Sequence, residues 1–253
     1  LSQREQKLLD AVRGLLAGGE SVMLNLQPSL LPRYGQQDPW NEVAQSIGLH
    51  VDTEHVLVER VATGPNRLEV QRGQLIQETN SSHIIARAVN GRQIFIPLPI
   101  TVEGGESLIV VKPSADRWLN QHWEREISNV AGKSPLSKDL PIASAVEYHG
   151  GARAIVVGSS GWLLTWASDR AVSLGGDQIA MVNPGNSEFL LAGVEWLSGL
   201  DEWIAAGPIG QQSTRVQGLS QSIYLVWTAL LILGIPLILL STAVVVSIRR
   251  HRP

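Results

Sequence analysis

The apolar stretch at residues 223–248 limits what this chain can fold into more than any other part of the sequence. No charged residue lies between Arg215 and Arg249, and the stretch is apolar apart from a few hydroxyl and aromatic side chains. A helix rises about 1.5 Å per residue, so it would span about 39 Å here, more than the roughly 30 Å of a bilayer core. A buried core helix rarely runs this long without a charge. We therefore expect one C-terminal transmembrane helix.

The two flanks of this stretch differ in charge, which predicts its orientation. Only Arg215 lies close on the N-terminal side. Three arginines follow on the C-terminal side: Arg249, Arg250 and Arg252. Because positive residues favour the cytoplasmic side, we expect a single-pass protein of the cytoplasmic (inner) membrane with a cytoplasmic C-terminus and a large extracytoplasmic domain. Tyr224 and Trp227 then fall at the outer interface of the lipid bilayer, where amphipathic rings anchor a helix.

The remainder of the chain has the composition of a globular body. Residues 1–206 contain enough Val, Ile and Leu for a core and are long enough for one large domain or two small ones. A polar linker is expected at residues 207–222, and residues 249–253 form a basic tail. The net charge is −3 and the Lys and Arg residues are scattered, so no nucleic-acid partner is expected. The chain has no cysteine, which excludes thiol catalysis and metal sites built on thiolates.

Helices and strands are predicted to alternate along this body, which is the pattern of a layered α/β domain. A capping box at Ser2 and Glu5 predicts a first helix, and Asp38-Pro39 predicts the start of a second. Apolar runs predict strands at SVMLNL, HVLVERV, SLIVVK, IASAVEY and ARAIVVG. The last two bracket His149-Gly150-Gly151 and are expected to pair.

Residues 68–101 change in character. The segments HIIARAV and RQIFIPLPI flank Asn90-Gly91, which is the strongest short signal for a β-hairpin. We therefore expect a β-rich insertion, or an edge of the layered domain, over residues 68–101.

The segment VVGSSGW provides the best-placed candidate for a ligand or partner site. It follows an apolar strand, and open α/β sheets usually bind ligands at the carboxyl ends of their strands. Gly158, Ser159 and Ser160 are the candidate residues, and a tight structural turn is the alternative. The segment is no nucleophile elbow, which needs a glycine two residues before and after the serine, because Gly158 and Gly161 are three residues apart.

Other candidate binding and metal motifs lack the residue spacing that their chemistry requires. The segment AGKSP resembles the end of a phosphate-binding P-loop, but the required earlier glycine is replaced by Ile127. None of the six histidines pairs with a glutamate at the spacing of a helical zinc site. We therefore assign no catalytic residue, no cofactor and no metal, and we expect the protein not to be an enzyme.

Eight tryptophans are many for this length, and exposed aromatic rings can stack on sugars. Trp118 and Trp123 fall in a segment with a helical pattern, and Trp196 and Trp203 lie in or beside a late helix that Asn186 is expected to cap. Core packing is the commoner fate of such residues. A cell-surface carbohydrate-active enzyme or a carbohydrate-binding module is the alternative function.

Several segments resemble one known family, the gliding-motility-associated, GldG-like auxiliary proteins of ABC-type transport systems. The resemblance is carried by DLPIASAVEYHGGARAIVVGSSGWLLTW, NPGNSEFLLAGVEWLSGLDEWIAAGP and the Arg-rich final span, and the segments LSQREQKLLDAVRGLLAGGESVMLNLQP and KPSADRW are also similar. Within the family pattern, a strand and its turn precede a helix. The corresponding positions here are Gly158-Ser159-Ser160, Asn186, Phe189, Trp196 and Leu197.

The resemblance implies a flavodoxin-like or class I glutamine-amidotransferase-like α/β core outside the membrane, without the amidotransferase cysteine. It also implies a non-enzymatic accessory subunit that partners ABC permease and ATPase subunits, and an upstream portion with another membrane helix. Two positions depart from the family pattern. Ser occupies the usual acidic position of the turn after the VVG strand, and Gly193 stands where Asn is usual, so we carry over no shared ligand contact.

Overall fold

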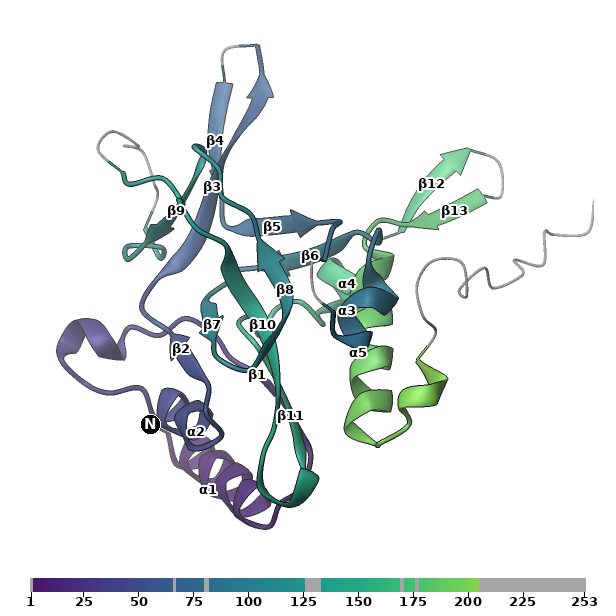
Figure 1. Ribbon diagram of the computed structural model, residues 1–253. Helices are drawn as coiled ribbons and strands as arrows, with labels where there is room; N and C mark the ends of the chain where they lie inside the picture. Colours follow the sequence, from purple (N-terminus) through teal and green to yellow (C-terminus); the bar gives the residue numbers. More distant parts are fainter. Residues whose placement is uncertain are drawn as a thin grey trace, which may run out of the picture. The chain divides into compact units, whose positions relative to one another are not determined.

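The computed structural model describes residues 2–65, 67–79, 82–125, 133–168, 171–175 and 178–204. These residues form a mixed α/β fold with several small sheets (Figure 1). Within these ranges, no helix combines the length and the apolar character that a membrane crossing requires. The linker at residues 207–222, the expected span at 223–248 and its anchoring residues lie outside the described residues.

A four-stranded sheet forms the centre of the body, in the order β1-β11-β10-β8. Its members are β1 (Val22–Asn25), β11 (Arg153–Val157), β10 (Leu140–Glu147) and β8 (Glu106–Val111). β1 and β11 run parallel, with Val22 opposite Ala154, whereas β10 is antiparallel to both β11 and β8. The strands predicted at SVMLNL, SLIVVK, IASAVEY and ARAIVVG are confirmed, as is the pairing of the last two.

Smaller antiparallel sheets surround this one. They are the pair β2 (His50–Asp52) and β7 (Thr101–Glu103), the pair β5 (Gly73–Ile76) and β6 (Ile94–Pro97), the three strands β4 (Arg67–Gln71), β3 (Val56–Gly64) and β9 (Arg117–Asn120), and the hairpin β12 (Ala171–Gly175) and β13 (Gln178–Met181). The helices are α1 (Gln3–Ala17), α2 (Pro39–Ser46), α3 (Ile84–Val89), α4 (Thr165–Ser168) and α5 (Pro184–Leu197), with short 3-10 turns η1 (Leu31–Tyr34), η2 (His149–Gly151) and η3 (Asp201–Trp203).

Both helix starts predicted from capping residues are confirmed. Ser2 and Glu5 form the reciprocal capping box of α1, since each side chain accepts a hydrogen bond from the other residue's main-chain N–H. The Asp38 side chain accepts a hydrogen bond from the N–H of Trp40 at 2.9 Å, and Pro39 takes the first position of α2.

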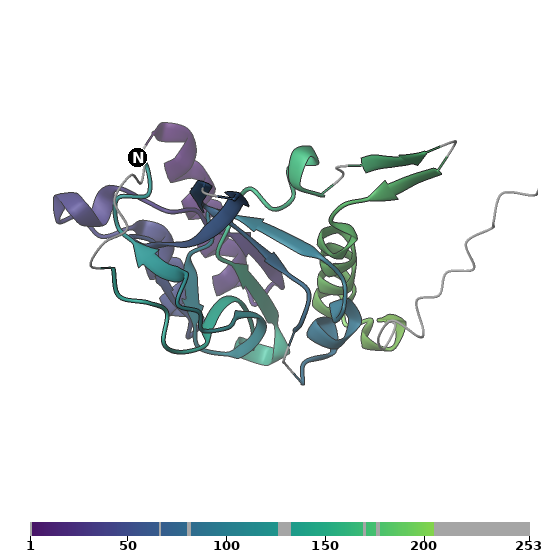
Figure 2. The ribbon, with the colours of Figure 1, turned by 90° about the horizontal axis from the view of Figure 1, so that it is seen from above.

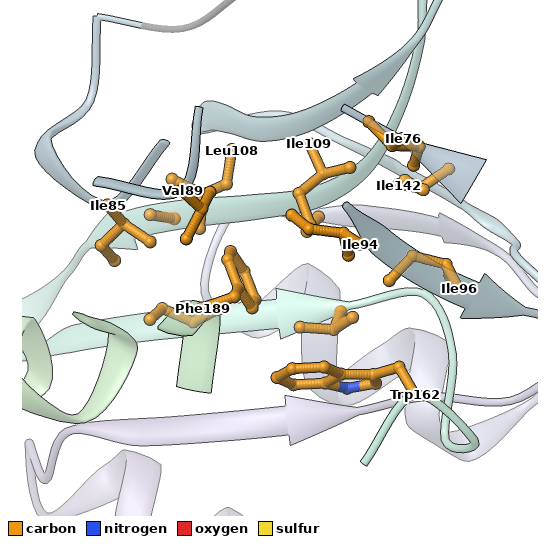
Figure 3. Close-up of a cluster of buried hydrophobic side chains, with 14 of the residues drawn as sticks. Ile76, Ile85, Val89, Ile94, Ile96, Leu108, Ile109, Ile142, Trp162 and Phe189 are labelled. Carbon is orange, nitrogen blue, oxygen red and sulfur yellow. The ribbon is translucent and has the colours of Figure 1, made fainter. Parts of the chain in front are cut away.

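The central sheet separates two hydrophobic cores. Successive side chains of a strand point to opposite faces, so Ala154 and Val156 of β11 pack in one core while Ile155 and Val157 pack in the other. Figures 1 and 2 show α1 and α2 on the first side and α3 and α5 on the second. The second core contains many β-branched and aromatic residues from β6, β8, β10 and the two helices (Figure 3). Covering on both faces explains why the central strands are almost continuously apolar.

The hairpin predicted around Asn90-Gly91 is wrong. HIIARAV contains helix α3, and β6 pairs with β5 instead. The reason is tertiary: Ile85 and Val89 are fully buried on α3, which packs against α5 and β8, and this burial outweighs the β propensity of the residues. Asn90 stabilises a loop, because its side-chain oxygen accepts a hydrogen bond from the N–H of Thr79 at 3.0 Å.

The helix predicted around Trp118 is also wrong. This segment is strand β9, in which Trp118 lies opposite Val58 of β3. Trp118 and Asn120 are buried while Leu119 is exposed, so the burial has the period of a strand. The late helix exists as predicted, but its N-cap position is Asn183, and Asn186 is inside the helix.

The end of α5 and the η3 turn are tied to the central sheet through Arg153. The guanidinium donates hydrogen bonds to both carboxylate oxygens of Asp201, at 2.5 and 2.9 Å, and to the carbonyl of Trp196 at 2.7 Å. It also lies 4.8 Å from the centre of the Trp196 ring, which packs edge-on against His83. Hydrogen bonding to Asp201 raises the pKa of Arg153 and so favours its charged form.

Burial lowers the pKa of the His83 imidazole in this cluster, with Glu106 opposing that effect. A neutral His83 thus contributes stability that is present above the unfolded pKa of about 6.5 and is lost as the pH falls below it. We expect the urea midpoint of unfolding to decrease between pH 7 and pH 5.5, and His83→Asn, which keeps a helix-capping acceptor, to reduce that decrease. The exposed His122→Asn is the control and should leave the pH dependence unchanged. An identical pH dependence for His83→Asn would contradict this expectation.

Candidate functional site

The parallel strands β1 and β11 end at the same edge of the central sheet, where the predicted candidate turn begins. The N–H of Leu26 donates to the carbonyl of Val157 at 2.9 Å, which extends the pairing to the last residue of β11. Gln27 and Ser160 then leave the sheet side by side, with the Ser160 hydroxyl 3.3 Å from the Gln27 side-chain oxygen. This is the edge at which open α/β sheets usually bind ligands.

Gly158 is required by the close approach of another backbone segment. Its N–H donates to the carbonyl of Ile142, and its carbonyl accepts from the N–H of Ile100, both at 2.8 Å. A Cβ atom at this position would lie 2.1 Å from the carbonyl oxygen of Ile100. Any side chain would therefore push apart the segments that close the sheet.

Ser159 is turned into the body. The residue is fully buried, and its hydroxyl donates to the carbonyl of Pro97 at 2.5 Å and accepts from the N–H of Gly161 at 3.3 Å. A serine hydroxyl has one proton to donate, and here the packing uses it. In this arrangement Ser159 offers no group to a ligand.

Ser160 is the exposed member of the three predicted residues. Next to it, the chain turns inward again at Trp162, whose ring is fully buried and packs edge-on against Phe189 at 5.2 Å (Figure 3). The indole N–H of Trp162 donates to the side-chain oxygen of Asn25 at 2.8 Å, which joins the turn to the end of β1. Ser160, next to the exposed Gln27, is thus the residue of this turn that is presented outward.

Asn186 is the polar residue that connects the segments of this region. From the sequence, the only structural role expected for it was to cap the late helix. Its side-chain amide donates to the carbonyls of Trp162 and Phe95, at 2.6 and 2.9 Å, and its oxygen accepts from the N–H of Phe95 at 2.8 Å. The side chain is fully buried, so each of these bonds replaces a lost bond to water. One amide thereby holds together β6, the turn and α5.

The structure places the remaining candidate residues in different environments. Trp118 and Trp196 are buried in the two cores, whereas Trp203 is 67% exposed and Trp166, which the sequence analysis did not single out, is 56% exposed. Trp166 packs edge-on against Phe95 at 5.7 Å. In the part of the chain that the structure describes, no group of three or more His, Asp or Glu side chains is arranged to hold a metal ion.

The two serines of the turn should respond differently to the same substitution. Ser159→Ala leaves the Pro97 carbonyl and the Gly161 N–H without their buried partner, so we expect the free energy of unfolding to decrease by about 1–3 kcal/mol. Ser160→Ala is the matched control on an exposed residue, and we expect a change within about 0.5 kcal/mol. Urea denaturation of both variants measures this. Equal changes in the two variants would show that the turn does not depend on the Ser159 hydroxyl.

Comparisons with known proteins give little beyond this geometry. No family model and no curated protein matches the chain. Among solved structures, the fold is similar to a chain described as "mmIFT52 N-terminal domain", with 15% identity and a TM-score of 0.46. The similarity covers 75% of this chain and 70% of that chain. Similarity at this level supports no statement about function, so the mixed α/β fold rests on the strands and helices of this chain itself.

Proposed function

We propose that this chain is a membrane-anchored, non-enzymatic accessory subunit of an ABC-type transport system. Its folded domain lies outside the cytoplasmic membrane and contacts a permease, a partner protein or an exported substrate, while separate ATPase subunits supply the energy. The proposal starts from the resemblance of residues 139–166 and 183–208 to GldG-like auxiliary proteins. It also starts from the apolar stretch at residues 223–248 and the arginines that follow it.

The non-enzymatic part of the proposal rests on the role that the family-like residues play in the fold. Gly158, Ser159 and Asn186 are buried and occupied by main-chain partners, and Phe189 and Trp196 pack in the second core. A motif of this kind specifies a fold, and within the described turn Gly158–Trp162 only the Ser160 hydroxyl remains exposed, without an acid or base of the turn beside it. An interaction domain needs only such a defined fold, whereas a catalytic centre also needs reactive groups that are free to meet a substrate.

The proposal includes a flavodoxin-like or class I glutamine-amidotransferase-like α/β core. In favour of it are the parallel β1–β11 pair and the helices on both faces of the central sheet. The antiparallel strands β10 and β8 then extend this nucleus on the side away from β1.

A second candidate is a carbohydrate-binding module or a cell-surface carbohydrate-active enzyme. The exposed rings of Trp166 and Trp203 favour it, because aromatic faces stack on sugars. The occupied strand-end turn argues for the accessory subunit over the enzyme.

Partner recovery tests the accessory role. The full chain, purified by affinity from detergent-solubilised native membranes, should bring down a multi-span permease and its ATPase. The matched control replaces residues 223–248 with an unrelated membrane helix, and it should retain the permease if the folded domain makes the contact. Recovery of neither subunit would count against the accessory role, and retention on sugar polymers without a permease would favour the second candidate.

Topology is tested separately. The net bias of arginines toward the C-terminal flank leads us to expect that protease added to spheroplasts digests the folded domain, and that carbonate does not extract the chain from membranes. As a control, a cytoplasmic protein of the same cells should stay intact until the membrane is lysed. Full protection of the domain, or release of the chain by carbonate, would overturn the expected orientation or anchoring.

A further inference from the structure

Segments from three distant parts of the sequence meet around the side chain of His83. This residue directly precedes α3, is 9% exposed, and packs edge-on against Trp196 near the end of α5, with the ring centres 5.0 Å apart. Arg153, the first residue of β11, binds the carbonyl of Trp196 and the carboxylate of Asp201 in η3. We call His83, Arg153, Trp196 and Asp201 the junction cluster, because the described residues end directly after η3, at Ile204.

The junction cluster closes one end of the second core. Helix α3 packs against α5 there (Figures 1 and 2). After α5 the chain turns at Gly199 and continues as η3, and the residue that follows η3, Ile204, is buried in the second core. None of the three residues of η3 is itself buried. This turn is therefore held to the body by the bonds between Asp201 and Arg153 and by the burial of Ile204.

The His83 ring takes part in this arrangement as a hydrogen-bond acceptor. Its Nδ1 atom accepts from the N–H of Ile85 at 3.2 Å, which caps the first turn of α3. A ring nitrogen accepts a hydrogen bond only when it carries no proton, so this cap requires the neutral imidazole. Because α3 has only six residues, the cap is a large share of what holds its first turn.

The surroundings of His83 favour the neutral ring. Burial lowers the pKa of His83, because the closed cluster gives an imidazolium little water. Charged groups from four elements also face the ring: Glu106 of β8, Arg153 of β11, Asp201 of η3 and Arg87 of α3. The two carboxylates raise the pKa and the two guanidinium groups lower it, so the charges act in opposite directions while burial dominates.

A proton on His83 changes the cluster in two ways. Nδ1 then faces the N–H of Ile85 as a second donor, so the cap of α3 is lost. The ring also becomes a cation that shares the Trp196 ring with Arg153, and both cations then compete for Asp201. Opening of the cluster lets water solvate the imidazolium and the freed N–H. Protons therefore favour an open arrangement of α3 and η3.

We propose that the junction cluster is an acid-sensitive latch: protonation of His83 releases the cap of α3 and the η3 turn, and so opens the end of the body from which residues 205–253 continue. The opening is local, because α3, α5 and η3 contribute no strand to the central sheet. The latch goes beyond the proposed accessory role and does not depend on it, since it rests on the packing of the described domain alone.

Hydrogen exchange of the full chain in detergent, measured by mass spectrometry at pH 7.5 and pH 5.5, tests the latch. The two data sets are corrected for the pH dependence of the chemical exchange rate. An opening that exposes a histidine with an ordinary pKa of about 6.5 becomes up to about tenfold more populated at pH 5.5. We expect peptides of α3 and of residues 198–204 to lose protection roughly three- to tenfold, and peptides of β1 and β10 to keep theirs. Unchanged protection of α3 and residues 198–204, or an equal loss in β1 and β10, overturns the proposal.

Variants of His83 assign the effect to this residue. His83→Asn keeps an acceptor for the cap but takes up no proton in this range, so the loss of protection at pH 5.5 should shrink to less than about twofold. His83→Gln also carries a neutral acceptor and serves if the Asn variant does not fold. The exposed His122→Asn is the matched control and should show the loss of the parent chain. A loss of the parent's size in the His83 variants, or its disappearance in His122→Asn, overturns the role of His83.

Discussion

The body of this protein depends on the alternation of side chains along β11. Ala154 and Val156 face the core under α1 and α2, while Ile155 and Val157 face the core under α3 and α5. A strand buried on both faces cannot shift its register by one residue without exchanging the two sets of side chains. The parallel pairing with β1 and the antiparallel pairing with β10 fix that register from both sides. Both layers of helices are thereby positioned by one five-residue strand.

The edge where β11 ends shows how the same strand controls the candidate site. Gly158 leaves space for the backbone at Ile100, and Ser159 directs its hydroxyl to Pro97. Asn186 then binds the main chain of Trp162 in the turn and of Phe95 in β6, and so connects both to α5. These interactions hold the turn within the packed fold. A ligand at this edge would meet Ser160 and Gln27, whose exposed side chains already contact each other.

Sequence patterns were sufficient where local signals and burial agree. The capped starts of α1 and α2 and the apolar strands of the central sheet are of this kind. Local signals failed at α3, where β-branched residues precede Asn90-Gly91 but burial against α5 selects a helix. The four residues of β9 are too few for their alternation to be read. The role of Asn186 was missed because its bonds to Phe95 join residues 91 positions apart, which only the fold brings together.

The two polar regions of the domain differ in a way that sequence position does not reveal. At the end of β11 every buried polar side chain named above has a partner, so burial there adds to stability. On the β2–β7 ribbon, the buried hydroxyl of Thr101 has none among the described residues. Burial of that hydroxyl adds nothing to stability, because an unpartnered buried hydroxyl raises the free energy of the folded state.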